Sequence, residues 1–208
     1  KYGDVSPGEF IPLMEQSGLI VPFGQWILSH GMAQCLEWRR SRPDFQISVN
    51  LSYIQLSQGD FISFLRTALE ENSLDPSRLI MELTETYLAK AEEDTLRLIA
   101  QMKELGVKIA MDDFGVGYSS LFSLKSIPVD VVKIDRRFVK GITSEPFNAT
   151  FIRSITDLCH DVGRKVCLEG VETKEEYEAV RELGMEYIQG YYFGRPMSAR
   201  QFEDRLKE

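Results

Sequence analysis

The chain has 208 residues, of which 43% are hydrophobic and 27% charged, and its formal net charge is −8. This composition is typical of a folded globular protein with one well-packed core. The excess of acidic residues argues against DNA binding, because a protein binds the phosphate backbone through a basic face. No apolar run approaches the roughly 18 residues that a membrane-spanning helix requires.

Hydrophobic periodicity predicts helices and strands that alternate along the chain. In chain order these are helices at 7–18 and 23–40, a strand at 46–50, a helix at 61–71, a strand at 78–82, a helix at 92–105, a strand at 107–112, a helix at 119–125, a strand at 129–135, a helix at 146–162, a strand at 165–169, a helix at 174–183, a strand at 187–189 and a helix at 198–206. Such alternation is typical of parallel strands joined by helical crossovers.

Two architectures fit this order, a doubly wound open sheet and a (β/α)8 barrel. Polar residues stand at or near the carboxyl ends of the predicted strands: Asn50, Glu82, Asp112, Asp113, Lys133, Glu169 and Gln189. A barrel brings all these ends to one mouth, whereas an open sheet brings together only those beside a switch point, so the barrel is favoured. Fewer strands are predicted than the about eight of a barrel. We therefore expect a single domain over residues 1–208 whose first strand lies outside the sequence.

Cysteine and histidine are not expected to carry the chemistry. Cys35, Cys159 and Cys167 share no metal-ligand spacing and are expected to be reduced, buried thiols of a cytosolic protein. His30 and His160 lie in helical patterns away from the acidic motifs, where core or surface roles are expected. The sequence thus predicts a cytoplasmic domain, or the cytoplasmic part of a larger, membrane-tethered protein.

Adjacent carboxylates, Asp112 and Asp113, end an apolar run and precede a loop with Gly115 and Gly117. Two neighbouring carboxylates at a strand end repel each other and lose solvation, and a divalent cation is the simplest compensation. Taken alone, the pair fits equally well with side chains that point into water or cap the next helix.

Further oxygen ligands follow other predicted strands. Asn50 and Glu82 would join Asp112 and Asp113 in an all-oxygen set, which suits Mg²⁺ or Mn²⁺ and disfavours zinc. A shared aspartate, here Asp112, would bridge two ions about 3.5–4 Å apart, as in two-metal phosphodiester hydrolysis.

Lys133 lies inside an otherwise apolar strand, where an ammonium is costly unless it is paired. It could form a structural salt bridge with a neighbouring carboxylate, or it could orient a nucleophilic water, and the second interpretation is favoured. Glu169 could bind metal or accept a proton from water. Glu172 fits a first-turn helix position nearly as well as a catalytic one, and Gln189 could present its amide to a base or a phosphate.

Six motifs contain these polar residues: Ser-Val-Asn-Leu-Ser at 48–52, Glu-Leu-Thr-Glu at 82–85, Asp-Asp-Phe-Gly-Val-Gly-Tyr-Ser-Ser-Leu at 112–121, Val-Lys-Ile-Asp at 132–135, Glu-Gly-Val-Glu-Thr at 169–173 and Gln-Gly-Tyr-Tyr-Phe at 189–193. In these motifs and their order the chain resembles the EAL domain family, bacterial phosphodiesterases that linearise cyclic di-GMP to pGpG. The resemblance implies a TIM-like (β/α)8 barrel whose first strand is antiparallel.

The resemblance also implies roles for particular residues. Two Mg²⁺ or Mn²⁺ ions would be held by Asn50, Glu82, Asp112, Asp113 and Glu169, with Lys133 and Glu169 as the catalytic pair at the nucleophilic water. Glu85 would anchor the loop that starts at Asp112 and couples dimerisation to metal binding. Glu172, Gln189, Gly115 and Ser119 would support the site or the ligand. The implied partners are cyclic di-GMP, a second copy of the chain, and an upstream sensor or diguanylate cyclase domain.

Departures from the family pattern leave an alternative open. Val116 stands where the family usually has threonine, and Ile54 stands where it often has arginine. The Glu-Ala-Leu signature, which carries a metal-ligand glutamate, is expected just before Lys1. The alternative is a degenerate EAL domain that binds cyclic di-GMP as a sensor or interaction module. A weaker alternative is that the chain is an unrelated barrel metallohydrolase that acts on another phosphate ester.

Overall fold

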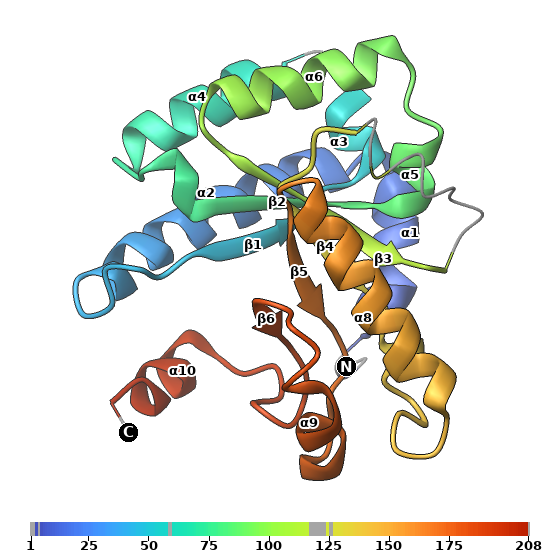
Figure 1. The fold of residues 1–208 in the computed structure, drawn as a ribbon. Coiled ribbons are helices and arrows are strands. Elements are labelled where there is room, and N and C mark those ends of the chain that lie inside the picture. Colours follow the sequence, from blue (N-terminus) through green and yellow to red (C-terminus); the bar gives the residue numbers. More distant parts are fainter. Residues whose placement is uncertain (1–2, 4, 58–59, 117–123, 125–126, 208) are drawn as a thin grey trace. The chain divides into compact units, whose positions relative to one another are not determined.

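The structure is a computed structural model, drawn in Figure 1, and it divides into two compact units that are described separately. The described residues are 3, 5–57, 60–116, 124 and 127–207. The first unit comprises Lys1–Glu82 with Glu92–Lys108, and the second comprises Leu83–Ala91 with Ile109–Glu208. The fold-class prediction can therefore be examined within each unit.

The first unit contains a pair of parallel strands with helices around it. Its elements are α1 (Pro7–Ser17), α2 (Ile20–Arg39), β1 (Ile47–Asn50), α3 (Tyr53–Ser57), α4 (Phe61–Glu71), the 3-10 helix η1 (Pro76–Arg78), β2 (Leu79–Thr84), which runs into the second unit, and α6 (Glu93–Glu104). Strands β1 and β2 are in parallel register, with Asn50 opposite Glu82. Helices α4 and α6 lie side by side (Figure 1).

The second unit contains four parallel strands in chain order, β3–β4–β5–β6. Its elements are α5 (Glu85–Ala89), β3 (Lys108–Phe114), β4 (Val131–Ile134), the 3-10 helix η2 (Arg136–Phe138), α8 (Pro146–Asp161), β5 (Lys165–Leu168), α9 (Lys174–Val180), β6 (Tyr187–Ile188) and α10 (Ala199–Arg205). Helix α8 packs along β5 (Figure 1). Parallel strands with helical crossovers place both units in the α/β class.

Nearly continuous apolar runs explain the central strands. In β3, Ile109, Ala110 and Met111 are at most 1% exposed, and in β4 Val132 and Ile134 are fully buried. A parallel strand covered on both faces has no solvent side, so its sequence does not alternate with polar residues. The burial therefore explains why a single charged side chain within β4, Lys133, is conspicuous.

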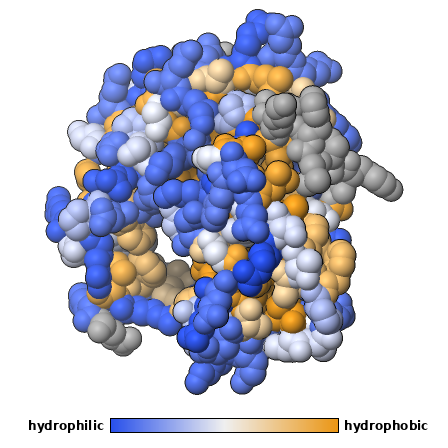
Figure 2. All heavy atoms as spheres, viewed as in Figure 1, coloured by the Kyte–Doolittle hydropathy of each residue, from blue (hydrophilic) through white to orange (hydrophobic). Residues whose placement is uncertain are grey.

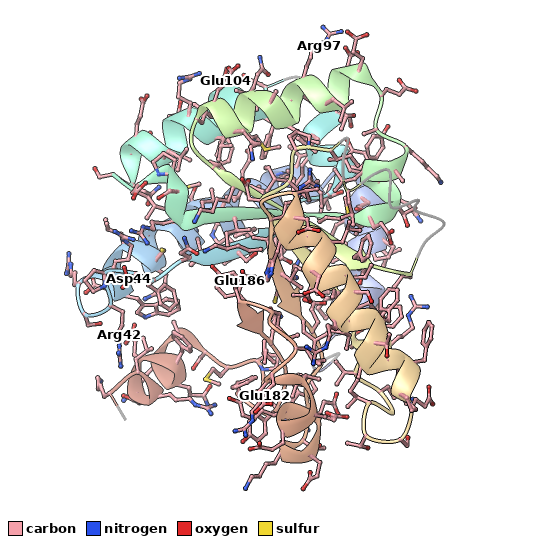
Figure 3. All side chains as sticks on the ribbon, viewed as in Figure 1. Arg42, Asp44, Arg97, Glu104, Glu182 and Glu186 are labelled. Carbon is pink, nitrogen blue, oxygen red and sulfur yellow. The ribbon has the colours of Figure 1, made fainter. Side chains whose placement is uncertain are left out.

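Helix α6 shows the opposite pattern, one apolar face and one polar face. Ile99 and Met102 are fully buried, whereas Arg97 is exposed and pairs with Asp94 at 2.8 Å. Hydrophilic residues dominate the outer surface around α6 in Figure 2, and Arg97 and Glu104 point outward from it in Figure 3. Across the described part of the chain, no helix is both long enough and apolar enough to cross a membrane.

The cysteines are free and buried, as predicted. Burial raises the pKa of the Cys35 thiol, and burial also raises the pKa of Cys159 to about 11. Thiols with raised pKa values are poor nucleophiles, which agrees with a packing role.

Most predicted elements are observed, with shifted ends. Helix α2 begins at Ile20 instead of residue 23, and α9 ends at Val180 instead of residue 183. The short helices α3 and α5 and the turn η2 were not predicted. The predicted helix at 119–125 lies outside the described residues except for Leu124.

Glu186 forms a clamp at the start of β5. Its Oε1 lies 3.0 Å from Nε2 of His160, and its Oε2 accepts a hydrogen bond from the Val166 N–H at 2.8 Å. Burial by itself would raise the pKa of the Glu186 carboxyl, but the bonds from Val166 and His160 outweigh burial and lower that pKa. His160 thus has the structural role expected from its helical position.

The Glu186 clamp predicts a pH-dependent stability. A carboxylate whose pKa is lowered on folding stabilises the fold above its unfolded pKa of about 4.3, and this contribution is lost as the pH falls through the folded pKa. Glu186→Gln should lower the free energy of unfolding by about 1 kcal/mol at neutral pH. Urea unfolding at a series of pH values should show that the difference in the free energy of unfolding between Glu186→Gln and wild type becomes smaller as the pH falls through the acid range.

Glu182→Gln is the matched control, because Glu182 lies in the same segment between α9 and β6 (Figure 3) but its side chain is 79% exposed. It should change stability little at any pH. An equal loss for Glu186→Gln at neutral and acid pH would contradict the role given to the clamp.

Candidate functional site

A buried lysine lies at the centre of the candidate site in the second unit. Lys133, in β4, is 5% exposed, and its Nζ lies 3.0 Å from Oδ1 of Asp112 and 2.7 Å from Oε1 of Glu169. Asp112 is in β3 and Glu169 directly follows β5, so strands on both sides of β4 supply the partners. The ion pairs satisfy the structural interpretation of Lys133, and they also place its ammonium beside two proposed metal ligands.

Asp112, Asp113 and Glu169 form what we call the acidic cluster. Each offers one carboxylate oxygen, and these oxygens all lie within 4.8 Å of one another. Asp113 has a left-handed backbone with φ of 58°, and the pairing of β3 with β4 shifts between Met111 and Phe114. This irregularity allows consecutive aspartates to contribute to one cluster, whereas a regular strand would direct them to opposite faces.

The acidic cluster carries more negative charge than Lys133 neutralises. Burial raises the pKa of Asp113, and the negative charges of Asp112 and Asp135 raise it further, while Lys133 and Arg137 act in the opposite direction. A bound divalent cation would remove this penalty. The donor set is all-oxygen, which fits Mg²⁺ or Mn²⁺, and the residues present therefore fit the expected metal.

In the first unit, Asn50 ends β1 and stands opposite Glu82, which lies two residues before the end of β2. Glu82 is 7% exposed and its carboxylate accepts a hydrogen bond from the Ser48 hydroxyl. The Glu82 carbonyl accepts a further bond from the Leu51 N–H at 2.9 Å. The predicted ligands of this unit thus share one carboxyl-end edge.

Glu85, 2% exposed at the start of α5, accepts a hydrogen bond at Oε2 from the Gly115 N–H at 3.0 Å. Gly115 adopts φ of 95°, a conformation that favours glycine. The contact ties Glu85 to the backbone immediately after the acidic cluster, at the loop that the family resemblance assigned to it. Ser119 and Gly117 of the same loop lie outside the described residues.

The remaining predicted residues lie on the loops after β5 and β6. Glu172 and Gln189 are exposed. The Gln189 N–H donates to the Leu168 carbonyl at 2.8 Å, and its carbonyl accepts from the Val171 N–H at 3.2 Å. Helix α9 begins at Lys174 and is capped by a reciprocal pair of bonds between Thr173 and Glu176, so Glu172 precedes the helix and is not in its first turn.

Asp135 ends the Val-Lys-Ile-Asp motif at 132–135, and the sequence predicts no role for it. It is 8% exposed, and its Oδ1 accepts hydrogen bonds from the backbone N–H and the Nε of Arg137, both at 2.9 Å. It thereby caps η2, and its charge also reaches Asp113. The available signal was its place one residue after an apolar strand, the same signal that identified Asp112.

The chain matches the model of the EAL domain family over residues 1–196, and it belongs to that family. It is 38% identical over 202 residues to the bifunctional diguanylate cyclase/cyclic di-GMP phosphodiesterase MucR of Pseudomonas aeruginosa, covering 97% of this chain and 30% of MucR. It is 35% identical over 201 residues to the cyclic di-GMP phosphodiesterase PdeR of Escherichia coli, again covering 97% of this chain and 30% of the relative. The chain thus spans less than a third of these relatives.

Solved structures give the same assignment. The PaMucR phosphodiesterase in complex with c-di-GMP superposes with a TM-score of 0.90 at 38% identity, covering 97% of this chain and 82% of that one. Klebsiella pneumoniae BlrP1 in a manganese/cy-diGMP complex has a TM-score of 0.77 at 29% identity, covering 85% and 45%. The predicted fold class, α/β of the TIM-like barrel type, is confirmed by this family membership.

The paired lysine leads to a stability prediction. Lys133→Met removes the buried cation and leaves the partly buried carboxylates of Asp112 and Glu169 without it, so the free energy of unfolding should fall by about 3 kcal/mol in metal-free buffer. Added Mn²⁺ should restore part of the loss, because the cation replaces the missing positive charge. Thermal or urea unfolding with and without Mn²⁺ measures both effects.

Lys140→Met serves as the control, because Lys140 is an exposed lysine of the same unit. It should leave stability within about 0.5 kcal/mol of wild type. A Lys133→Met variant as stable as Lys140→Met would contradict the view that Lys133 neutralises the acidic cluster.

Proposed function

We propose that this chain is a phosphodiesterase domain that hydrolyses one phosphodiester bond of cyclic di-GMP and releases linear pGpG. The observation that carries the proposal is the acidic cluster with Lys133 between two of its carboxylates. Support for the substrate comes from the relatives named cyclic di-GMP phosphodiesterases and from the c-di-GMP complex of the 38% identical PaMucR domain.

Two Mg²⁺ or Mn²⁺ ions are the proposed cofactors. The proposed ligands are Asn50, Glu82, Asp112, Asp113 and Glu169, and Asp112 would be the ligand that both ions share. The manganese complex of the BlrP1 relative supports this assignment. When bound, such ions polarise the phosphate and lower the pKa of an attacking water.

Lys133 and Glu169 are the proposed catalytic pair. The Lys133 ammonium lies 2.7 Å from Glu169, so it can offset phosphate charge while it orients a water held by the same carboxylate. The water oxygen forms a bond to phosphorus, its proton passes to the Glu169 carboxylate, and the ester P–O bond on the opposite side breaks. The departing ribose oxygen takes up a proton from solvent water and leaves as a hydroxyl.

Supporting roles are proposed for Glu85, Gly115, Ser119, Glu172 and Gln189. The contact of Glu85 with Gly115 supports the first two assignments. Glu172 and Gln189 are proposed to contact the ligand, because they follow the strands that end at Leu168 and at Ile188.

We further propose that residues 1–208 form one EAL domain of a longer protein that acts as a homodimer in the cytoplasm. Free, buried cysteines are typical of a reducing compartment and support the location. The bifunctional relative MucR supports an upstream sensor or diguanylate cyclase domain.

Turnover should depend on the catalytic pair and the bridging aspartate. Asp112→Asn and Lys133→Ala should each reduce pGpG formation at least 100-fold, and a chelator should abolish it in wild type. The longest gene product containing this chain would be incubated with cyclic di-GMP and Mg²⁺ or Mn²⁺, and pGpG would be followed by chromatography.

Glu178→Gln is a suitable control, because Glu178 pairs with Arg181 on a partly exposed face of α9. It should retain full activity. Near-normal rates in both Asp112→Asn and Lys133→Ala would exclude the assigned roles, and hydrolysis of a different phosphate ester in a substrate panel would exclude cyclic di-GMP as the substrate.

A catalytically degenerate, ligand-binding EAL domain is the second candidate, and Ile54 is the observation that favours it. Ile54 lies on α3, partly buried, where the family often has an arginine that could pair with a phosphate. Sub-micromolar binding of cyclic di-GMP without turnover would favour this candidate over the enzyme.

Restoring the arginine tests the importance of this departure. Ile54→Arg should lower KM for cyclic di-GMP about tenfold and leave kcat nearly unchanged, because the added contact is made equally in ground and transition states. Ile54→Met is the control, since it keeps an apolar side chain of similar volume. Steady-state kinetics with equal KM values for the two variants would show that position 54 does not contact the phosphate.

A further inference from the structure

Phe138 occupies the space behind Gly115. A Cβ atom added to Gly115 would lie 2.6 Å from Cε2 of Phe138 and 3.6 Å from Cζ of Phe151. The first distance is shorter than any normal carbon contact, so the ring stands where a side chain would be. Gly115 is therefore required both for its φ of 95° and for the close approach of an aromatic ring.

The position of the Phe138 ring is fixed by its own neighbours. Phe138 ends η2, the turn that Asp135 caps after β4. Its ring stacks on Phe151 of α8, with the ring centroids 4.0 Å apart and the planes at 11°. Phe147, one helical turn earlier, continues the stack at 6.1 Å from Phe151 but is 68% exposed. The ring against Gly115 is thus backed by a helix.

Glu85 holds the Gly115 peptide by a different contact, a hydrogen bond of 3.0 Å from the Gly115 N–H. The backbone at Gly115 is therefore fixed by an aromatic ring as well as by a buried carboxylate. Asp113 is only two residues earlier and already has a left-handed backbone, so its freedom to move depends on where Gly115 is held.

We propose that Phe138, backed by Phe151, is a positioning residue that keeps the Gly115 peptide on Glu85 and thereby keeps Asp113 in the acidic cluster. The inference deepens the proposed function, on which it rests for the identity of the bound cation. The contacts that support this role are those of Phe138 with Gly115 and Phe151. Phe138 acts through the backbone, and its removal changes how well the aspartates are placed for a cation.

Phe138→Leu and Phe147→Leu form a matched pair of variants. Both replace one ring of the same stack with the same apolar side chain, but the atoms nearest to a Cβ on Gly115 belong to Phe138 and Phe151, not to Phe147. Two quantities are measured on the whole chain: amide hydrogen exchange of the Gly115 N–H in metal-free buffer, and the affinity for Mn²⁺ alone by titration. Neither requires substrate or turnover.

Phe138→Leu should accelerate exchange of the Gly115 amide at least about fivefold and weaken Mn²⁺ binding about 10–100-fold, whereas Phe147→Leu should change both less than about twofold. Equal effects of the two variants would overturn the inference, because the ring stack would then matter only for general stability. Unchanged exchange in Phe138→Leu would overturn it as well.

A double-variant cycle with Glu85→Gln separates positioning from a merely structural role. If both residues act through the Gly115 peptide, the Mn²⁺ affinity lost in the double variant should be less than the product of the single losses. If the loss of Mn²⁺ affinity in the double variant equals the product of the losses in the two single variants, the inference would be overturned. A wild-type chain that binds no Mn²⁺ would contradict the proposed function instead, and exchange of the Gly115 amide would then decide the inference by itself.

Discussion

The buried ammonium of Lys133 is the constraint on which the second unit depends. A lysine inside an apolar strand is tolerated only when carboxylates neutralise it, and here Asp112 and Glu169 do so at 3.0 and 2.7 Å. Those partners belong to the strands on either side, so the charge pairing requires the parallel order of β3, β4 and β5. Fold and site are thus linked, because the pairing that neutralises the lysine also gathers the carboxylates.

The acidic cluster is destabilising when considered alone. Asp113 sits beside the negative charges of Asp112 and Asp135 and has a backbone conformation that is uncommon for a residue other than glycine. Strain and charge repulsion of this kind persist where surrounding contacts enforce them, and they concentrate at functional sites. The hydrogen bond from Gly115 to Glu85 and the ring of Phe138 are such contacts.

The sequence predicts the parts of this structure that depend on local patterns. Apolar runs predict β3, β4 and β5, and a carboxylate directly after such a run identifies Asp112 and Glu169 as candidates for the same strand-end edge. Short elements such as α5 and η2 are not predicted, since each is too short to show a helical periodicity of apolar residues. Helix ends shift by a few residues for the same reason, as at the start of α2.

Contacts between distant residues could not be predicted from the sequence. Nothing near Glu186 indicates that it will bind His160, and nothing near Gly115 indicates an aromatic neighbour from η2. These contacts depend on how strands and helices pack. The sequence predicts an ion pair of Lys133 as one of two interpretations, because a charge in an apolar run requires a partner, but only the packing of the strands selects Asp112 and Glu169 as the partners.

The two-metal site is tested most directly by a crystal structure of this chain soaked with Mn²⁺, with the ions located by their anomalous scattering. We expect two peaks, both within ligand distance of Asp112, with Asp113 and Glu169 among the remaining ligands. No peak at the acidic cluster at saturating Mn²⁺, with Lys133 still bound to both carboxylates, would contradict it. The lysine would then neutralise the cluster by itself, and the chain would not be a two-metal phosphodiesterase.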